Sequence, residues 1–239
     1  MRRNPPLLFG EVEQELSSTL ELTGPVQKER AEQPDFSPSF LREATKLVYR
    51  LFRTPDAPVV SSVLFCGVDD SSNRNSVCWH TAEILAAQVP GSVCVVDANF
   101  RSPSAHLHFG VENDRGFTDS LLQPGPMRAF ARQIPSGNLW VVPYGSSLPN
   151  GWVLFSPEQL GSRMMELRTL FDYVLVDVAP AGIFFDAAVL GQHVSGAVMV
   201  IEPNSTKRET AYQAKATLEA AKVRILGAVL HRRVSSASK

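Results

Sequence analysis

The chain has 239 residues, of which 44% are hydrophobic and 20% charged, which is enough for one large α/β domain with a substantial core. Its 23 Lys and Arg residues balance 24 Asp and Glu residues, and the net charge of -1 gives no basic field that would attract nucleic acid. The three cysteines are an odd number without CxxC spacing, which excludes a disulfide scaffold and predicts buried, reduced thiols in a cytoplasmic protein.

The N-terminal region is expected to hold a leader and one helix. Residues 1–38 mix Pro, Glu, Gln and Ser without a sustained apolar period, which predicts a flexible leader. Ser39 fits a helix N-cap, and apolar residues then recur at helical spacing, so residues 39–54 are predicted to form an amphipathic helix. No apolar run approaches the roughly 18 to 20 residues that span a bilayer, so we expect no direct membrane insertion.

Short apolar runs then alternate with helical patterns over residues 55–235, and residues 236–239 form a short polar tail. This alternation predicts an α/β fold, a doubly wound, mostly parallel sheet with helices on both faces. Strands are expected at Val59–Gly67, Ser92–Asp97, Leu139–Pro143, Tyr173–Val178, Ala197–Ile201 and Ile225–Leu230. Helices are expected at Ser76–Gln88, Thr118–Leu122, Pro157–Phe171, Asp186–His193 and Lys207–Ala221.

Polar residues end three of these strands on the same expected edge of the sheet. Asp97 closes one apolar run and Asp177 closes another, and the first strand leads through a loop into a helix near Asn75. An Asp at a strand end is usually a turn or helix cap. Two of them facing a loop-to-helix turn favour a nucleotide site, because ligands of such folds bind beyond the carboxyl ends of the strands.

Several segments resemble the P-loop domain of the bacterial tyrosine autokinases of capsule and exopolysaccharide assembly, which are more distantly related to the MinD and ParA ATPases. The segments are VVDANFRSPSAHLHFG, RGFTDSLL, SPEQLGSRMMELRTLFDYVLVDVAP and GAVLHRRV, and they are similar to the family's LLIDADLRRPSLHKLFG, GLSDLL, NPSELLGSRRMRELL with YDYVIIDTPP, and GVVLNRV. The resemblance runs from about Glu43 to Arg233. It implies a P-loop NTPase-like fold that binds ATP and Mg²⁺, with a Walker A loop after the first strand, a Walker A′ segment at Asp97 and a Walker B carboxylate at Asp177.

The Walker A loop departs from the family pattern. Asp70 to Ser76 stand where the family has Pro-Gly-Glu-Gly-Lys-Ser-Thr, so both glycines are absent, Arg74 replaces the lysine and Asn75 replaces the magnesium ligand. Phosphate loops need glycine so that backbone N–H groups can converge on the phosphates, and they need lysine for its compact charge. Asn73 could adopt the left-handed conformation of a glycine, and Asn75 offers an amide oxygen to a metal.

The resemblance assigns roles to further positions. Asp97 and Asp177 are the catalytic candidates of an active enzyme, and Asn75 and Asp177 are the candidate Mg²⁺ ligands. The candidate nucleotide-binding residues are Asn73, Arg74, Asn75, Ser76, Arg101 and His231. Asn99 stands in place of the second Walker A′ acid, and His231 stands in place of the asparagine that reads adenine in related proteins.

Two further patterns leave alternatives open. The helix segment EATKLVYR resembles a family segment that packs against a neighbouring subunit, which would give a homo-oligomer, although it could equally cover its own sheet. His106 and His108 are two residues apart on a loop or short helix, and we expect them to be packed or solvated rather than to form a metal pair.

The losses affect phosphate, metal and base contacts together while the apolar runs persist. We therefore expect a regulatory or docking module in exopolysaccharide or capsule assembly, with lost or weak ATP hydrolysis, that docks on the cytoplasmic end of a membrane polysaccharide chain-length regulator at the inner face of the membrane. The chain's four tyrosines form no terminal cluster, so we expect no autophosphorylation of a tail. The alternatives are an active tyrosine kinase that acts on another chain and a MinD- or ParA-like positioning ATPase.

Overall fold

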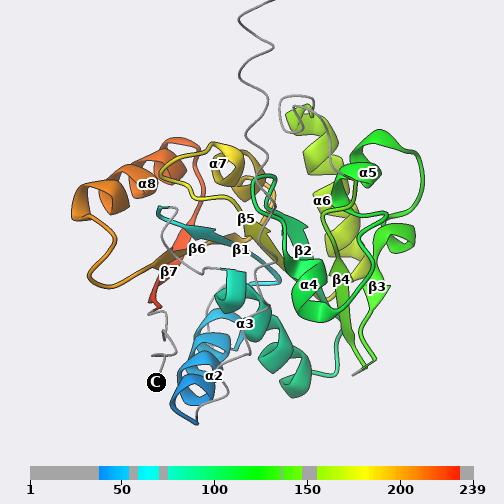
Figure 1. Cartoon of the computed structure of the whole chain (residues 1–239), viewed down its shortest axis with the longest axis horizontal. Coiled ribbons are helices and arrows are strands. Elements are labelled where there is room, and N and C mark those ends of the chain that lie inside the picture. The colour runs from blue at the N-terminus through cyan, green and yellow to red at the C-terminus, as the bar shows by residue number, and fades with distance from the viewer. Residues whose placement is uncertain (1–37, 54–58, 70–74, 136, 147–154, 232–239) are drawn as a thin grey trace, which may run out of the picture. The chain divides into compact units, whose positions relative to one another are not determined.

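The computed structural model describes residues 38–53, 59–69, 75–135, 137–146 and 155–231, all within one compact unit of the chain (Figure 1). The side chains of residues 38–40 and 75–76 are not among the described parts. Nearly all of the predicted leader, the predicted tail and residues 70–74 of the predicted Walker A loop also lie outside them.

Helices and strands alternate along the chain as the sequence predicts. The helices are α2 (Pro38–Phe52), α3 (Asn75–Gln88), α4 (Ala105–Phe109), α5 (Phe117–Leu122), the 3-10 helix η1 (Met127–Phe130), α6 (Pro157–Leu170), α7 (Asp186–Gly191) and α8 (Arg208–Ala220). The strands are β1 (Ser62–Gly67), β2 (Val93–Ala98), β3 (Arg132–Gln133), β4 (Leu139–Val142), β5 (Tyr173–Val178), β6 (Gly196–Ile201) and β7 (Ile225–Leu230).

The strands form one sheet in the order β3-β4-β2-β5-β1-β6-β7. Neighbouring strands are parallel except β3, which runs antiparallel to β4. The inner strands are nearly continuous runs of Val, Leu, Ile and Cys, and β1 and β2 are buried along their whole length. Such runs suit strands that are covered on both faces. The predicted doubly wound, mostly parallel α/β fold is confirmed.

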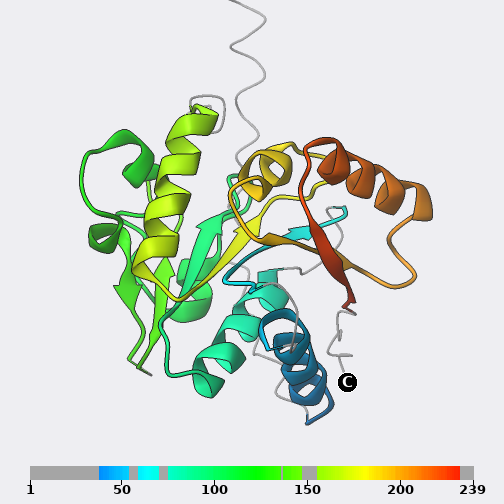
Figure 2. The ribbon, with the colours of Figure 1, turned by 180° about the vertical axis from the view of Figure 1, so that it is seen from behind.

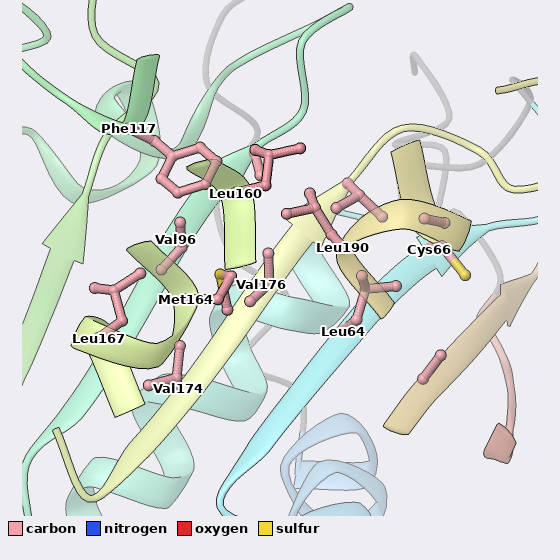
Figure 3. Packing of buried hydrophobic residues seen from close by; sticks show 14 of the residues in the cluster. Leu64, Cys66, Val96, Phe117, Leu160, Met164, Leu167, Val174, Val176 and Leu190 are labelled. Atoms are coloured by element: carbon pink, nitrogen blue, oxygen red, sulfur yellow. The ribbon is translucent and has the colours of Figure 1, made fainter. Parts of the chain in front are cut away.

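Helices cover both faces of this sheet (Figures 1 and 2). On one face α5, α6, α7 and α8 pack on alternate strand residues such as Leu64, Val96 and Val176, with Met164 of α6 and Leu190 of α7 set among them (Figure 3). On the opposite face α2, α3 and α4 pack with the intervening residues, which include Val63, Val95 and Leu175. The central strands therefore contribute side chains to two core layers, one on each side of the sheet.

Some boundaries and short elements differ from the predictions. The helix expected at residues 39–54 spans Pro38–Phe52, so Ser39 lies in its first turn and its prediction as the N-cap is wrong. Proline suits the first turn because its missing N–H has no partner there in any helix. The sequence patterns missed β3 and η1 because elements of two and four residues are too short to show a period.

The three cysteines are buried thiols, as predicted. Burial raises the pKa of Cys78 on α3 and of Cys94 on β2. Within the described ranges, no helix has both the length and the hydropathy to cross a bilayer.

Candidate active site

The candidate site lies at the carboxyl ends of three adjacent strands, β2, β5 and β1. The connection from β1 to β2 passes over β5 toward one side of the sheet. The connection from β5 to β6 passes over β1 toward the other side. The loops that follow β1 and β5 therefore diverge at this edge, and such a divergence is where open α/β sheets form a ligand crevice.

Asp97 and Asp177 form a carboxylate pair at this edge. They are direct partners in the register of β2 and β5, and their exposed fractions are 0% and 1%. They continue the alternation that places Val95 and Leu175 on the α3 side of the sheet. Cys78 of α3 lies close to this pair. Its pKa is raised mainly by burial, and next by the charges of Asp177 and Asp97. The pair thus lies beneath the first turn of α3.

Asp97 also stabilises the turn between β2 and α4. Its Oδ1 accepts the backbone N–H of Asn99 at 3.2 Å, and its Oδ2 accepts those of Ser104 and Ala105, both at 2.9 Å. These bonds hold the backbone at the start of α4. Burial raises the pKa of Asp97 to about 6, although the three backbone hydrogen bonds oppose that rise. Asp97 therefore fixes the β2–α4 turn as well as lining the site.

Asn99 contributes a buried amide next to the pair. Its Oδ1 accepts the backbone N–H groups of Arg101 at 3.3 Å and Ser102 at 3.2 Å. Its Nδ2 is buried and has no hydrogen-bond partner among the described residues. The NH₂ group of Asn99 thus presents its N–H donors at this edge of the sheet.

Arg101 joins the loops that follow β2 and β5. Its guanidinium carbon lies 4.4 Å from the centre of the Phe184 ring. The pKa of Asp186, in the first turn of α7, is raised by burial, and the charge of Arg101 offsets part of that rise. Sequence reasoning missed Asp186, which is 7% exposed. The available signal was an acid at the start of a helix directly after a Gly-Ile-Phe-Phe loop on the same edge.

The loop after β5 is in close contact with the end of β1. The N–H of Ala181 donates to the carbonyl of Gly67 at 2.9 Å. A Cβ placed on Gly182 would lie 2.4 Å from the carbonyl oxygen of Val68, so glycine is the residue that this approach permits.

The structure brings some of the predicted site residues together and separates one. Asp97, Asp177 and Arg101 lie at the ends of β2 and β5. His231 follows β7, the edge strand, and lines a separate cavity of about 290 Å³ between β7, α2 and α3. Asn75 and Ser76 open α3, with side chains outside the described parts, and Asn73 and Arg74 lie outside the described residues.

ATP and Mg²⁺ fit this site only in part. The Asp177 carboxylate suits a magnesium-bound water, and the Asn99 Nδ2 donor suits an anionic oxygen. Residues 68–76, however, contain neither glycine nor lysine, and they include two acids, Asp69 and Asp70. This composition does not suit a triphosphate cradle.

The chain is similar in sequence to bacterial tyrosine-protein kinases. Tyrosine-protein kinase YwqD of Bacillus subtilis is 31% identical over 172 residues, which cover 72% of each protein. Tyrosine-protein kinase Wzc of Salmonella typhi is 28% identical over 138 residues, which cover 58% of this chain but only 19% of Wzc. No protein-family profile matches the chain.

Solved structures agree with this similarity. The kinase domain of the Escherichia coli tyrosine kinase ETK is 25% identical, with a TM-score of 0.68 over 83% of this chain and 76% of that domain. The chimerical protein CapA2B2 is 22% identical, with a TM-score of 0.74 over 85% of this chain and 88% of its own, and shares the fold. MinD of Aquifex aeolicus, in its complex with MinC, also shares the fold, with a TM-score of 0.60 over 72% of this chain and 68% of its own at 18% identity. Because its identity to YwqD exceeds 30% over more than two thirds of both proteins, the chain belongs to the family of bacterial tyrosine-protein kinases.

Proposed function

We propose that this member of the tyrosine-kinase family acts in the assembly or export of a capsule or exopolysaccharide as a regulatory or docking module whose ATP hydrolysis is lost or weak. The pathway follows from the family resemblance. The observation that carries the loss of hydrolysis is the contrast at one sheet edge between an intact carboxylate pair and a phosphate loop without glycine or lysine.

The chemistry of phosphoryl transfer supports this reading. Catalysis by P-loop enzymes rests on positioning and charge neutralisation, which the loop backbone, its lysine and Mg²⁺ provide. Arg74 keeps the positive charge, but its planar fork does not replace a compact ammonium within a tight loop. Asp97 accepts three backbone hydrogen bonds, and this structural role does not depend on ATP turnover.

The docking role depends on surfaces that do not need catalysis. The core layers on both sides of the sheet are intact, so a fold that no longer hydrolyses ATP still presents the same outer helices. The partner that the resemblance implies is the cytoplasmic end of a membrane polysaccharide chain-length regulator, at the inner face of the membrane. A homo-oligomer through α2 belongs to the same proposal.

An active kinase acting on another chain is the second candidate, and the retention of both carboxylates favours it. In that case Arg74 takes the role of the lysine, Asp177 holds the Mg²⁺ site and Asp97 assists removal of a proton from the substrate hydroxyl.

A nucleotide titration separates the two candidates. The purified chain and its Asp177→Ala variant are each titrated with a fluorescent ATP analogue, with and without Mg²⁺. The control variant is Asp172→Ala, which removes a carboxylate that immediately precedes the first residue of β5, at the end of the strand away from Asp177. A regulatory module shows weak binding that neither Mg²⁺ nor Asp177→Ala alters. Micromolar, Mg²⁺-dependent binding that disappears in Asp177→Ala and persists in Asp172→Ala would overturn the proposal in favour of the active kinase.

A restored loop tests whether the loop itself is the cause. The variant combines Ser71→Gly, Asn73→Gly, Arg74→Lys and Asn75→Ser. If the loop is the missing part, this variant gains Mg²⁺-dependent ATP binding that still requires Asp177. If binding does not improve while the thermal unfolding temperature is unchanged, the defect lies elsewhere in the site.

A further inference from the structure

Two imidazoles and one carboxylate from α3 and α4 converge on one another. His80 and Glu83 belong to α3 and are three residues apart, so they share one helix face. His108 belongs to α4. One ligand atom from each of the three residues lies within 4.8 Å of the other two. None of these residues belongs to the candidate nucleotide site.

The geometry of the group is close to that of a coordination shell. His108 Nε2 lies 3.1 Å from Glu83 Oε1, and the rings of His80 and His108 meet edge to face with centroids 5.4 Å apart. Ligands of one tetrahedral zinc ion stand about 2.0 to 2.2 Å from the metal, and therefore roughly 3.3 to 3.6 Å from one another. Small side-chain rotations would bring all three donor atoms to that spacing.

The burial of the three residues is graded. His80 is 6% exposed, whereas the side chains of His108 and Glu83 are 13% and 35% exposed. The inner imidazole is fixed by packing, and the outer carboxylate faces water, which gives an ion a route to the group. The rings of Trp79 and His108 are also in contact, with centroids 4.7 Å apart.

We propose that His80, Glu83 and His108 form a binding site for a divalent transition metal, with Zn²⁺ as the best match. Two imidazoles exclude Mg²⁺ and Ca²⁺ as preferred ions, since these prefer oxygen ligands. Two histidines and one glutamate are an established zinc set that leaves a fourth position for water. His106, two residues before His108, is not part of the group.

A bound ion would link α3 to α4. The start of α4 is tied to Asp97, and α3 begins where the predicted phosphate loop ends. The ion would therefore fix two elements that flank the candidate active site without entering it. This inference rests on the histidine and carboxylate geometry alone, so it stands whether or not the chain hydrolyses ATP.

The test uses the full chain without an affinity tag, freed of metal by chelation. Zinc binding is measured by calorimetry, and Co²⁺ binding by its visible absorption, which reports a tetrahedral nitrogen and oxygen shell. We expect one ion per chain, a higher unfolding temperature with zinc, and at least a tenfold loss of affinity in His108→Gln and in Glu83→Gln. The matched control His106→Gln changes a histidine on the same short helix and should bind as the parent chain does.

Three outcomes would overturn the proposal. The parent chain could fail to bind zinc or cobalt, which would leave His108 and Glu83 as an ordinary hydrogen-bonded pair. Binding could remain in His108→Gln and Glu83→Gln at the parent affinity. Binding could also fall equally in His106→Gln, which would place the ion elsewhere. The two test variants alter partly exposed side chains, and their unfolding temperatures without metal establish that they fold.

Discussion

Individual residues at the sheet edge were predictable where an apolar run ends in an acid. Asp97 and Asp177 could be found in this way because parallel strands bring their carboxyl ends to one edge. The second role of Asp97 could not, because α4 has five residues and too little pattern to show that a helix starts there. Asp186 was missed for a similar reason, since its burial depends on a loop that folds back over the end of β1.

Asp172 illustrates a stabilising carboxylate that the structure explains. Its Oδ2 accepts the backbone N–H of Ser92 at 2.7 Å and the Ser92 hydroxyl at 2.8 Å, and these bonds hold its pKa below the ordinary value of 3.8. The stabilisation is present above the unfolded pKa and is lost as pH falls through the lower folded pKa. Asp172→Ala should reduce the free energy of unfolding by about 1 kcal/mol at pH 7, because the group is exposed and screened.

Urea denaturation of both proteins at pH 7 and pH 3 checks this prediction. The difference in the free energy of unfolding should be smaller at pH 3, which lies below the unfolded pKa, because the stabilisation decreases as pH falls toward the lower native pKa. An equal difference at the two pH values would show that the charge of Asp172 is not what stabilises the fold.

Gly182 provides a steric prediction at the same scale. In Gly182→Ala the added Cβ would meet the Val68 carbonyl, which is backbone and cannot move aside alone, so we expect a loss of about 1 to 3 kcal/mol in the free energy of unfolding. Gly227→Ala on β7 is the control, because its added Cβ has no atom of a described residue within 4 Å apart from its chain neighbours. Chemical denaturation measures both variants, and similar losses in the two would contradict the steric explanation.

Helices and strands were the best-predicted scale of this protein. The strands at Tyr173–Val178 and Ile225–Leu230 have the predicted bounds, and α3 begins one residue before its prediction, because each is a long run with a clear period or a marked end. Contacts between elements were not predictable. Arg163 of α6 donates to the carbonyls of Ser120, Gln123 and Gly125, at 2.7 to 2.9 Å. These partners are about forty residues away in the sequence, and no local pattern predicts them.

The Arg163 contacts predict how α5 is held against α6. In Arg163→Lys the single ammonium cannot reach three carbonyls in different directions, so the free energy of unfolding should fall by about 1 to 3 kcal/mol. Arg168→Lys on the same helix is the control, because its guanidinium donates to the His193 carbonyl at 3.3 Å, a longer bond that a lysine could replace. Thermal unfolding of both variants measures the difference, and equal shifts would contradict a special role for Arg163.

At the scale of the whole molecule, the fold follows from strands that are apolar on both faces. A sheet with helices on both faces was predictable from the sequence, because these strands have no polar face that could be exposed to water. It could not predict β3, whose Arg-Gln pair joins the sheet only through the antiparallel approach to β4.

The two core layers predict cooperative unfolding. Met164→Ala removes packing on one face of the sheet and Leu85→Ala removes packing on the other, and each buried side chain should cost about 2 to 5 kcal/mol. Their effects should add within about 0.5 kcal/mol, because the sheet separates them. Denaturation followed by fluorescence and by circular dichroism should give one coincident transition in each variant, and separate transitions would show that the layers unfold independently.

The placement of Cys78 in the first turn of α3, where its thiol is buried, gives the protein an internal probe of local motion. A buried thiol whose ionisation is opposed by two nearby carboxylates cannot react with an alkylating reagent until α3 lifts from the sheet. In a Cys66→Ala, Cys94→Ala background, the labelling rate of Cys78 therefore measures how often that lifting occurs. A ligand that draws α3 toward the carboxylate pair would slow the labelling without any change in the folded structure.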